Sequence, residues 1–316
     1  MCASPLGSPR RVTRSGWWVL SSIGLCLLLL AVRFALPIWQ RAAFLNEIER
    51  IGGNFNSSKG GPPWLRNLLG DYGMRGFDEV WSLSLPGKIR PEDMLLGVDD
   101  APQVGAPTAK IENGLLTRTL LFPGLIAIHL DGTTFDNQGI AVLGTLPKLG
   151  QLYLFDSNLD DEGLSGISNS KSILHLFAGY TRVTDASLSR LRQMTQLEYL
   201  GLRGDDITDA GLASLSSLIN LTDLNLSETH ITDAGLRHLA AARKLQRVDL
   251  FDTAVSEAGV LEFVANHPNL EELQLSPDQI SANGMDDLQR QNPALKVVIM
   301  VNENDGSGFS RRKPRR

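Results

Sequence analysis

The sequence predicts an α/β solenoid, in which a curved parallel sheet is backed by short helices on its convex side. Three observations lead to this fold class. A leucine pattern returns at a fixed step, each copy alternates apolar and polar residues over a short stretch, and most copies continue into Thr-Asp-x-Gly-Leu or a close variant. A unit of this kind buries almost nothing on its own flanks, so it needs neighbours on both sides.

Residues 221–244 give the clearest copy of the unit. Leu224 and Leu226 alternate with polar residues, which predicts a short strand that sends its leucines inward. Thr229 occupies the turn, where a hydroxyl can bond to backbone groups. Thr232 is a suitable helix N-cap, and Asp233 follows in the first turn, where the helix dipole favours a negative charge. The unit is therefore strand, turn and short returning helix.

The other copies define a repeat domain over residues 80–301. Val80 starts the first copy, and the second starts only at Leu125, which indicates an irregular insertion over about residues 86–113, rich in Pro, Gly and Asp. From there the step is 24 residues five times and then 25 twice, with starts at Leu125, Leu149, Ile173, Leu197, Leu221, Leu245, Leu270 and Leu295. The last copy has a strand but no helix after it.

The N-terminal region predicts a membrane anchor. Residues 1–14 are polar and basic, and no charged residue occurs from Ser15 to Val32. Eighteen helical residues would span about 27 Å, close to a hydrocarbon core of about 30 Å. We expect a transmembrane helix over residues 15–38, ended by Pro37, with the N-terminus in the cytoplasm and the repeat domain periplasmic or extracellular.

Two other interpretations of this region stay open. A cleaved signal peptide is one, although Arg33 and Arg41 occupy the positions before Ala35 and Ala43 where a small residue is needed. A lipoprotein site at Cys26 is the other, and Leu25 and the apolar run around it do not favour it. The membrane anchor and the cleaved signal peptide would both export the repeat domain.

The regions that flank the repeats have their own patterns. Residues 41–79 predict a helical N-terminal cap that covers the first strand, with a helix over 42–51 and a polar linker over 54–63. In the next helix, Trp64, Leu65, Leu68 and Leu69 are expected on one face. Residues 302–316 are polar and end in basic residues, which predicts a disordered tail.

The units LTDLNLSETHITDAGL, LEYLGLRGDDITDAGL and LQRVDLFDTAVSEAGV resemble the bacterial I-T-D-x-G-L subclass of leucine-rich repeat proteins. The segment GGPPWLRNLLGD is similar to the stretch that precedes such repeats in membrane-anchored bacterial members. The resemblance covers roughly residues 45–301 and implies a curved binding scaffold, usually for proteins. The chain departs from the pattern at Ala178, Ser187, Asp205 and Asp278.

Nothing in the sequence points to catalysis, a cofactor or a metal. The net charge is −5, which gives no reason to expect a nucleic acid partner. Both cysteines lie within the first 26 residues, so the repeats cannot hold a disulfide framework. His129 and His175 lie two repeats apart, about 10 Å at about 4.8 Å per strand, which is too far to share one ion. Paired acids such as Asp160-Asp161 fit helix caps better than acid/base groups.

The strand positions that face outward, onto the concave side, predict a ligand-binding surface. They are aromatic in the first repeats and acidic in the later ones. Strand propensity alone can explain single aromatic residues, but a contiguous group on adjacent strands favours binding. Gly201 is expected to leave room beside the aromatic rings for an inserted side chain or sugar. The candidate residues are His129, Tyr153, Phe155, His175, Phe177, Tyr180, Tyr199, Arg203 and Asp249.

The sequence therefore predicts a non-catalytic, membrane-anchored and exported scaffold that engages a protein partner on its concave face. A glycan is a possible partner of the same surface, since aromatic side chains suit either. The alternative is a structural envelope protein that acts by self-association or by contact with the cell wall.

Overall fold

The computed structural model describes residues 33, 35–85, 109–112 and 114–301. The chain divides into two compact units, Met1–Asn46 with Lys59–Asp78 and Glu47–Ser58 with Glu79–Arg316. The predicted basic tail, the charge-free run up to Val32, most of the predicted insertion and the C-terminal tail lie outside the described residues. Of the helices that the structure describes, none is both long and apolar enough to cross a bilayer.

The N-terminal elements differ from the sequence prediction in two places. α2 spans Leu36–Arg50, so Pro37 lies in its first turn and does not end a helix. Proline is tolerated there because the first turn needs no backbone N–H donor. The segment expected as a polar linker contains a strand, β1 (Asn54–Ser58), which pairs antiparallel with β2 (Glu79–Ser84). After it come α3 (Pro63–Gly73) and the 3-10 turn η2 (Arg75–Phe77).

One sheet runs through the repeat unit in the order β1-β2-β4-β6-β7-β8-β9-β10-β11-β12. Apart from the β1–β2 pair, all neighbours in it are parallel. A separate two-stranded sheet joins β3 (Ala109–Lys110) to β5 (Thr133–Thr134). The repeat strands are β4 (Ala127–His129), β6 (Gln151–Tyr153), β7 (His175–Phe177), β8 (Tyr199–Gly201), β9 (Asp223–Asn225), β10 (Arg247–Asp249), β11 (Glu272–Leu275) and β12 (Lys296–Ile299).

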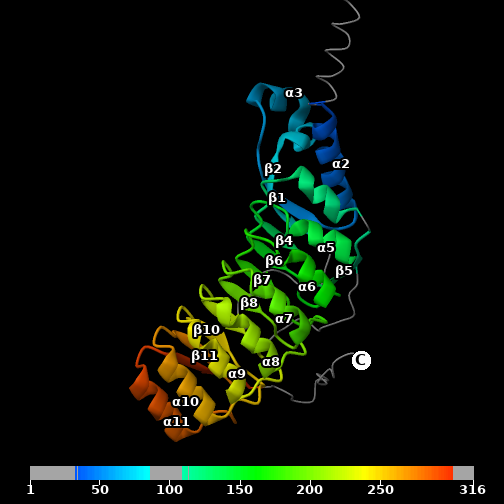
Figure 1. Ribbon diagram of the computed structural model, residues 1–316. Coiled ribbons are helices and arrows are strands. Elements are labelled where there is room, and N and C mark those ends of the chain that lie inside the picture. The colour runs from blue at the N-terminus through cyan, green and yellow to red at the C-terminus, as the bar shows by residue number, and fades with distance from the viewer. Residues whose placement is uncertain (1–32, 34, 86–108, 113, 302–316) are drawn as a thin grey trace, which may run out of the picture. The chain divides into compact units, whose positions relative to one another are not determined.

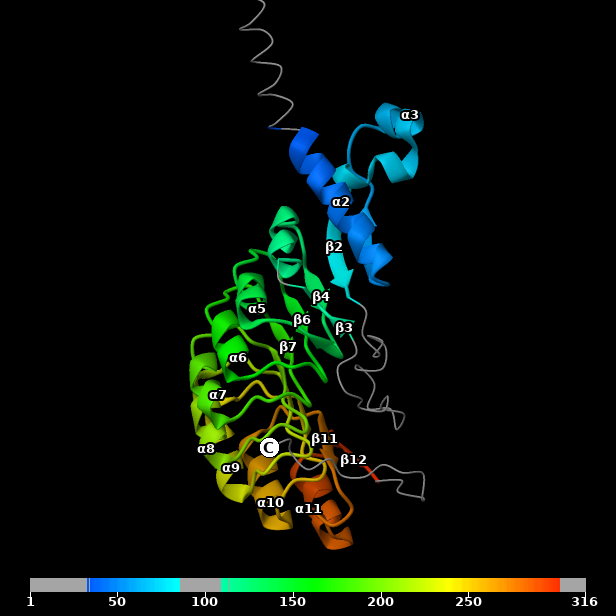
Figure 2. The same cartoon turned by 90° about the vertical axis from the view of Figure 1, so that its right-hand side faces the viewer.

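Short helices return the chain from each strand to the next. They line the convex side of the repeat unit, and the strands line the concave side (Figure 1 and Figure 2). They are α5 (Asn137–Leu143), α6 (Asp161–Ile167), α7 (Asp185–Leu191), α8 (Asp209–Leu212), α9 (Asp233–Arg237), α10 (Glu257–Asn266) and α11 (Ala282–Gln291), with 3-10 turns η3 (Leu116–Leu121), η4 (Ala213–Ser217) and η5 (His238–Ala241).

The core follows the predicted alternation. The central residue of each strand points inward and lies beside its counterparts in the neighbouring strands. These residues are almost fully buried: Ile128, Leu152, Leu176, Leu200, Leu224 and Val248. The register expected from the sequence is therefore confirmed along the strands that carry the candidate site.

The Thr-Asp-x-Gly motif locks each repeat to the next. Asp209 of one repeat accepts hydrogen bonds from the backbone N–H (2.8 Å) and hydroxyl (2.7 Å) of Thr232 in the following repeat. A Cβ atom on Gly235 would lie 2.3 Å from the same carboxylate, so only glycine fits there. The Asp161–Thr184, Asp185–Thr208 and Asp233–Ser256 pairs are bonded in the same way. The motif aspartate thus joins repeats as well as opening its own helix.

A second column of residues makes the turn after each strand. Its backbone has positive φ at positions 24 residues apart, where glycine is favoured. Glycine holds two of these six positions, and larger residues hold the rest: Gly132, Asp156, Tyr180, Gly204, Glu228 and Asp252. The backbone at Tyr180 and Glu228 is therefore strained.

Candidate functional site

The candidate site lies on the open face of the sheet, where outward residues of adjacent strands form two columns. Strand pairing places His129, Tyr153, Phe177, Gly201 and Asn225 beside one another, with Asp249 next in line. His175 and Tyr199 belong to the second column. The structure therefore brings the predicted aromatic residues together, as the repeat register requires.

Four rings of this face form one continuous stack. The ring centroids of His129 and Tyr153 are 4.0 Å apart, those of Tyr153 and Phe177 4.2 Å, and those of Phe177 and Tyr199 4.1 Å. The strand spacing of about 4.8 Å allows such contact when the rings lean together. We call these four residues the ring ladder.

The ring ladder corrects two expectations. Tyr153 and Phe177 are each only 5% exposed, because each ring is covered on both faces by its neighbours. They therefore belong to the packed structure and are not free anchors for a ligand. The space beside Gly201 is also filled, since a Cβ atom there would lie 3.1 Å from the Tyr199 ring. Glycine at this position lets Tyr199 lean across and complete the stack.

A second cluster forms where the strands end. The ring of Phe155 packs edge-on against Tyr180, with centroids 5.1 Å apart. The Tyr180 hydroxyl donates to Glu228 Oε2 at 2.6 Å, and Arg203 donates to Glu228 Oε1 through two nitrogens, at 3.0 and 2.7 Å. Glu228 was missing from the predicted site. Its 48-residue spacing from Tyr180, two whole steps, is the signal in the sequence that would have found it.

Burial perturbs the acid that lies near His129, at one end of the ladder. Asp131 accepts a hydrogen bond from the backbone N–H of Phe155, at 2.9 Å. Burial raises the pKa of its carboxyl to about 7, although the Phe155 bond acts in the opposite direction. Burial also lowers the pKa of His129 to about 4. His129 Nδ1 and Asp131 Oδ2 lie 3.9 Å apart, and neither has a hydrogen-bond partner among the described residues.

The remaining predicted residues divide between the two columns. His175 is partly exposed and lies 3.4 Å from Gln151 Nε2 and 3.7 Å from Glu198 Oε2. Asp249 accepts a hydrogen bond from Asn225 Nδ2 at 3.0 Å, and burial raises its pKa. Within the described ranges, no three His, Cys, Asp or Glu side chains are placed to hold a metal ion.

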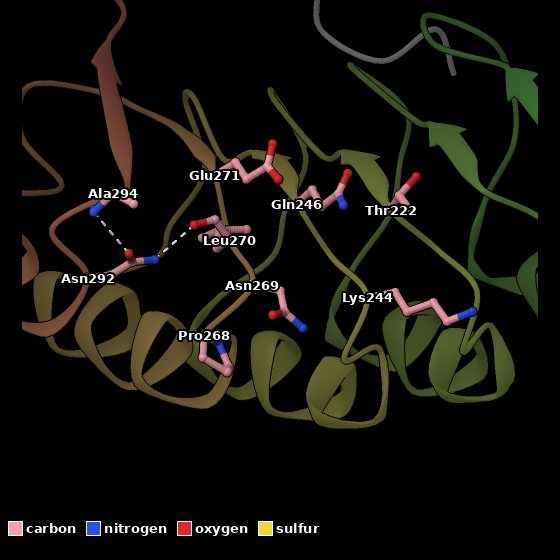
Figure 3. A pocket seen from close by; sticks show the side chains of 9 residues that line it. All are labelled: Thr222, Lys244, Gln246, Pro268, Asn269, Leu270, Glu271, Asn292 and Ala294. Carbon is pink, nitrogen blue, oxygen red and sulfur yellow. Dashed lines mark hydrogen bonds between the residues drawn. The ribbon is translucent and has the colours of Figure 1, made fainter.

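A hollow of ≈ 390 Å³ lies elsewhere, where the strands of the last repeats begin (Figure 3). It contains none of the predicted site residues. Its wall is of mixed polarity. Asn292 is fixed in it, since its Nδ2 donates to the Leu270 carbonyl at 2.8 Å and its Oδ1 accepts from the Ala294 N–H at 3.2 Å. The lining residues are Thr222, Lys244, Gln246, Pro268, Asn269, Leu270, Glu271, Asn292 and Ala294.

Comparison with known proteins bears on the fold. Residues 217–240 match the family model described as "Leucine Rich repeat". No curated protein matches the chain.

Several solved structures are similar. Internalin C2 from Listeria monocytogenes is 22% identical, with 71% of this chain and 81% of that one covered and a TM-score of 0.48. An internalin from the same species is 17% identical, with 62% and 68% covered and a TM-score of 0.42. A leucine-rich repeat protein of Leptospira interrogans is 17% identical, with 57% and 50% covered and a TM-score of 0.40.

The family match falls on the clearest unit of the sequence, and the same unit recurs along the parallel sheet with its convex helices. The fold of the repeat unit is therefore that of a leucine-rich repeat solenoid.

Proposed function

We propose that this protein is a non-catalytic scaffold, anchored in a membrane and exported, that binds a protein partner on the concave face of its sheet. Repeat solenoids offer extended concave surfaces of this kind for binding. The observation that carries the proposal is the ring ladder, which runs across four adjacent strands on the open face of the sheet.

The ring ladder forms a rigid, packed surface, and the more exposed groups around it make the contacts with a protein partner. Since Tyr153 and Phe177 cover one another, a partner meets the more exposed groups beside them, chiefly His175, Arg203 and Glu228. The Arg203–Glu228 pair is held in place by Tyr180, so it loses little freedom when a partner binds. Fixed polar groups next to packed aromatic rings are typical of surfaces that bind a folded protein.

A glycan fits this face less well. Sugar rings usually pack on an open aromatic face, and the two inner rings of the ladder have no open face. The concave surface therefore favours a protein partner.

The membrane anchor is the second part of the proposal. It is supported by the charge-free run of residues 15–32 within the proposed span 15–38, and by Arg10, Arg11 and Arg14 before the run. Basic residues on the N-terminal side favour a cytoplasmic N-terminus and place the repeats in the periplasm or outside the cell.

Photo-crosslinking in intact cells tests the binding face. A benzophenone amino acid replaces His175 on the concave face, Ser189 on the convex helix α7, or Gln246 in the hollow. We expect a heterologous protein adduct from position 175 alone. Adducts from position 189 or 246 without one from 175 would move the binding surface away from the ring ladder.

Self-association is a second candidate, and one observation favours it. β12 is the last strand of the sheet and pairs only with β11 among the described strands. Ile299 and Val301 at this end are exposed. An apolar sheet edge of this kind can pair with a second copy. A benzophenone at Val301 would then give an adduct of twice the chain mass.

A further inference from the structure

α3, which is kinked at Gly70, carries large apolar side chains that are uncovered in the N-terminal unit. Four of its large side chains are between 50% and 74% exposed: Trp64, Leu68, Leu69 and Tyr72. No residue of α3 is buried. The sequence predicted Trp64, Leu68 and Leu69 on one face of this helix, and all three side chains are exposed within the N-terminal unit. A soluble monomer rarely exposes such a group of side chains unless something binds it.

An ion-pair network fixes the helix in this orientation. Arg66 donates to Asp71 Oδ1 at 2.8 Å and to the Gly60 carbonyl at 2.9 Å, and it also bonds to Asp78. At about 100° per residue, Arg66 and Leu68 point to nearly opposite sides of a helix. Because Arg66 binds the body of the unit, Leu68 is held on the outer side. The exposure of Trp64 and Leu68, each two residues from Arg66, is therefore built into the unit.

The start of α2 also carries exposed apolar side chains. Leu36 and Trp39 are both exposed and lie three residues apart, on one side of the helix. A Cβ atom on Gly76 would lie 2.2 Å from the Ile38 carbonyl oxygen, so the turn after α3 packs directly on the first turns of α2. Figure 2 shows α3 standing apart from α2, with the turn that follows α3 lying between them.

The chain that precedes α2 indicates what covers this surface. Its 18-residue charge-free run ends at Val32, four residues before α2 begins at Leu36. Tryptophan and tyrosine together with leucine are the residues that settle at the boundary between lipid headgroups and acyl chains. We propose that α3 docks on the surface of the membrane that carries the chain, on the same side as Trp39, which directly follows the proposed span. This inference rests on the anchor proposed above.

Such docking gives the N-terminal unit two points of attachment to the bilayer. The anchor alone would leave this unit free to rotate about one connection. A second contact through α3 would fix which side of the unit faces the lipid.

The test uses the full chain, one copy per nanodisc, in a bilayer of phosphatidylcholine and phosphatidylglycerol. Three single-cysteine proteins carry an NBD fluorophore. The first keeps Cys26 and has Cys2→Ser, so it reports the anchor. The second and third lack both native cysteines (Cys2→Ser, Cys26→Ser). The second carries Leu68→Cys, and the third carries Ile219→Cys. Ile219 is exposed as Leu68 is, but lies in the repeat unit, so it is the matched control.

We expect a lipid-borne nitroxide near the headgroups to quench the fluorophore at position 68 and leave the one at 219 unchanged. Adding Trp64→Glu and Leu69→Glu should abolish the quenching at 68, because both side chains are exposed and can be changed without disturbing the core. Quenching at Cys26 by deeper nitroxides shows that the anchor is inserted.

The outcomes separate the two proposals. If Cys26 is quenched and position 68 is not, the anchor stands and the docking surface is overturned. If Cys26 is not quenched by lipid, the anchor itself fails and the docking surface fails with it. If the fluorophore at 68 is shielded from aqueous iodide but not reached by the nitroxide, the chain itself covers α3, and the docking proposal is again overturned.

Discussion

Single residues on the concave face show why exposure is hard to predict from a repeat pattern. The register assigns Tyr153 and Phe177 to the outward side, and the structure agrees. Whether an outward ring is free depends on the side chains one strand away, which stand about 4.8 Å off. Here Gly201 has no side chain, so Tyr199 folds across it and closes the stack on Phe177.

Truncation of the ring ladder should therefore destabilise the fold. We expect Phe177→Ala to lower the free energy of unfolding by about 3 kcal/mol, because a nearly buried ring is lost and two stacked neighbours are uncovered. Urea titration followed by circular dichroism measures the change. Ile219→Ala, at an exposed position, is the control and should stay within about 0.5 kcal/mol of the parent protein. An equal effect of the two substitutions would contradict the stack.

His129 and Asp131 are expected to make opposite contributions to the pH dependence of the unfolding free energy. The folded chain holds a proton on Asp131 up to about pH 7, against an ordinary pKa of 3.8, so this group lowers stability as pH rises between those values. His129 titrates near pH 4 when folded, against 6.5, so it raises stability as pH rises over that range. Each effect is at most about 1.4 kcal/mol per pH unit. The two slopes nearly offset one another between about pH 4 and 6.5.

Single substitutions should separate the two slopes. With Asp131→Asn, the unfolding free energy relative to the parent should climb from about pH 4 to 7, because the falling contribution of Asp131 is removed. With His129→Phe, which keeps a ring in the stack, it should fall from about pH 4 to 6.5, because the rising contribution of His129 is removed. Urea titrations over this pH range measure both. Parallel curves for the two variants would show that burial does not set these pKa values.

Elements in this fold are defined partly by the repeat that follows them. The helix cap at Thr232 was predicted from sequence, and its side chain accepts from the N–H two residues on. Thr208 caps α8 in the same way. The bond from the next repeat to each motif aspartate was not predicted, because it links residues 23 positions apart. Strand β1 was also missed, since Asn54–Ser58 has almost no apolar residues. It is a strand because β2 offers it an open edge.

Steric coupling between neighbouring repeats can be measured directly. We expect Gly235→Ala to cost about 1–3 kcal/mol, because the new methyl group displaces the Asp209 carboxylate from Thr232. In a chain that already carries Asp209→Ala, the same change should be neutral or stabilising, as alanine is favoured over glycine in a helix. Gly150→Ala is the control, since its nearest atoms would be 3.8 Å away. Additive effects in this double-mutant cycle would refute the coupling.

At the scale of the whole molecule, the period of the sequence predicted the parallel order of the repeat strands and their inward leucines. The sequence could not show how outward side chains pack, because the period fixes their side of the sheet and nothing more. The order of elements in the N-terminal region was also less predictable, since residues 54–78 carry no repeat.

Topology is the prediction that belongs to this scale. In spheroplasts of a bacterium that expresses the full chain, we expect added protease to remove an epitope at the C-terminus and spare one at the N-terminus. The reason is the charge-free run with its basic N-terminal flank. Detergent lysis is the control and should expose both epitopes. A mature protein that begins near residue 36 or 44 would instead indicate a cleaved signal peptide.

The bonds between successive repeats also constrain how the chain can change its length. Loss of residues 186–209, one whole unit, would place Asp185 against Thr232 and Gly235, the partners that Asp209 has now. At the C-terminal end the acid is Glu257, one methylene longer, and its partner Ser281 lies one residue further along. A gain or loss of complete units would therefore leave a matched junction, whereas a change by a fraction of a unit would set a carboxylate against the wrong neighbour.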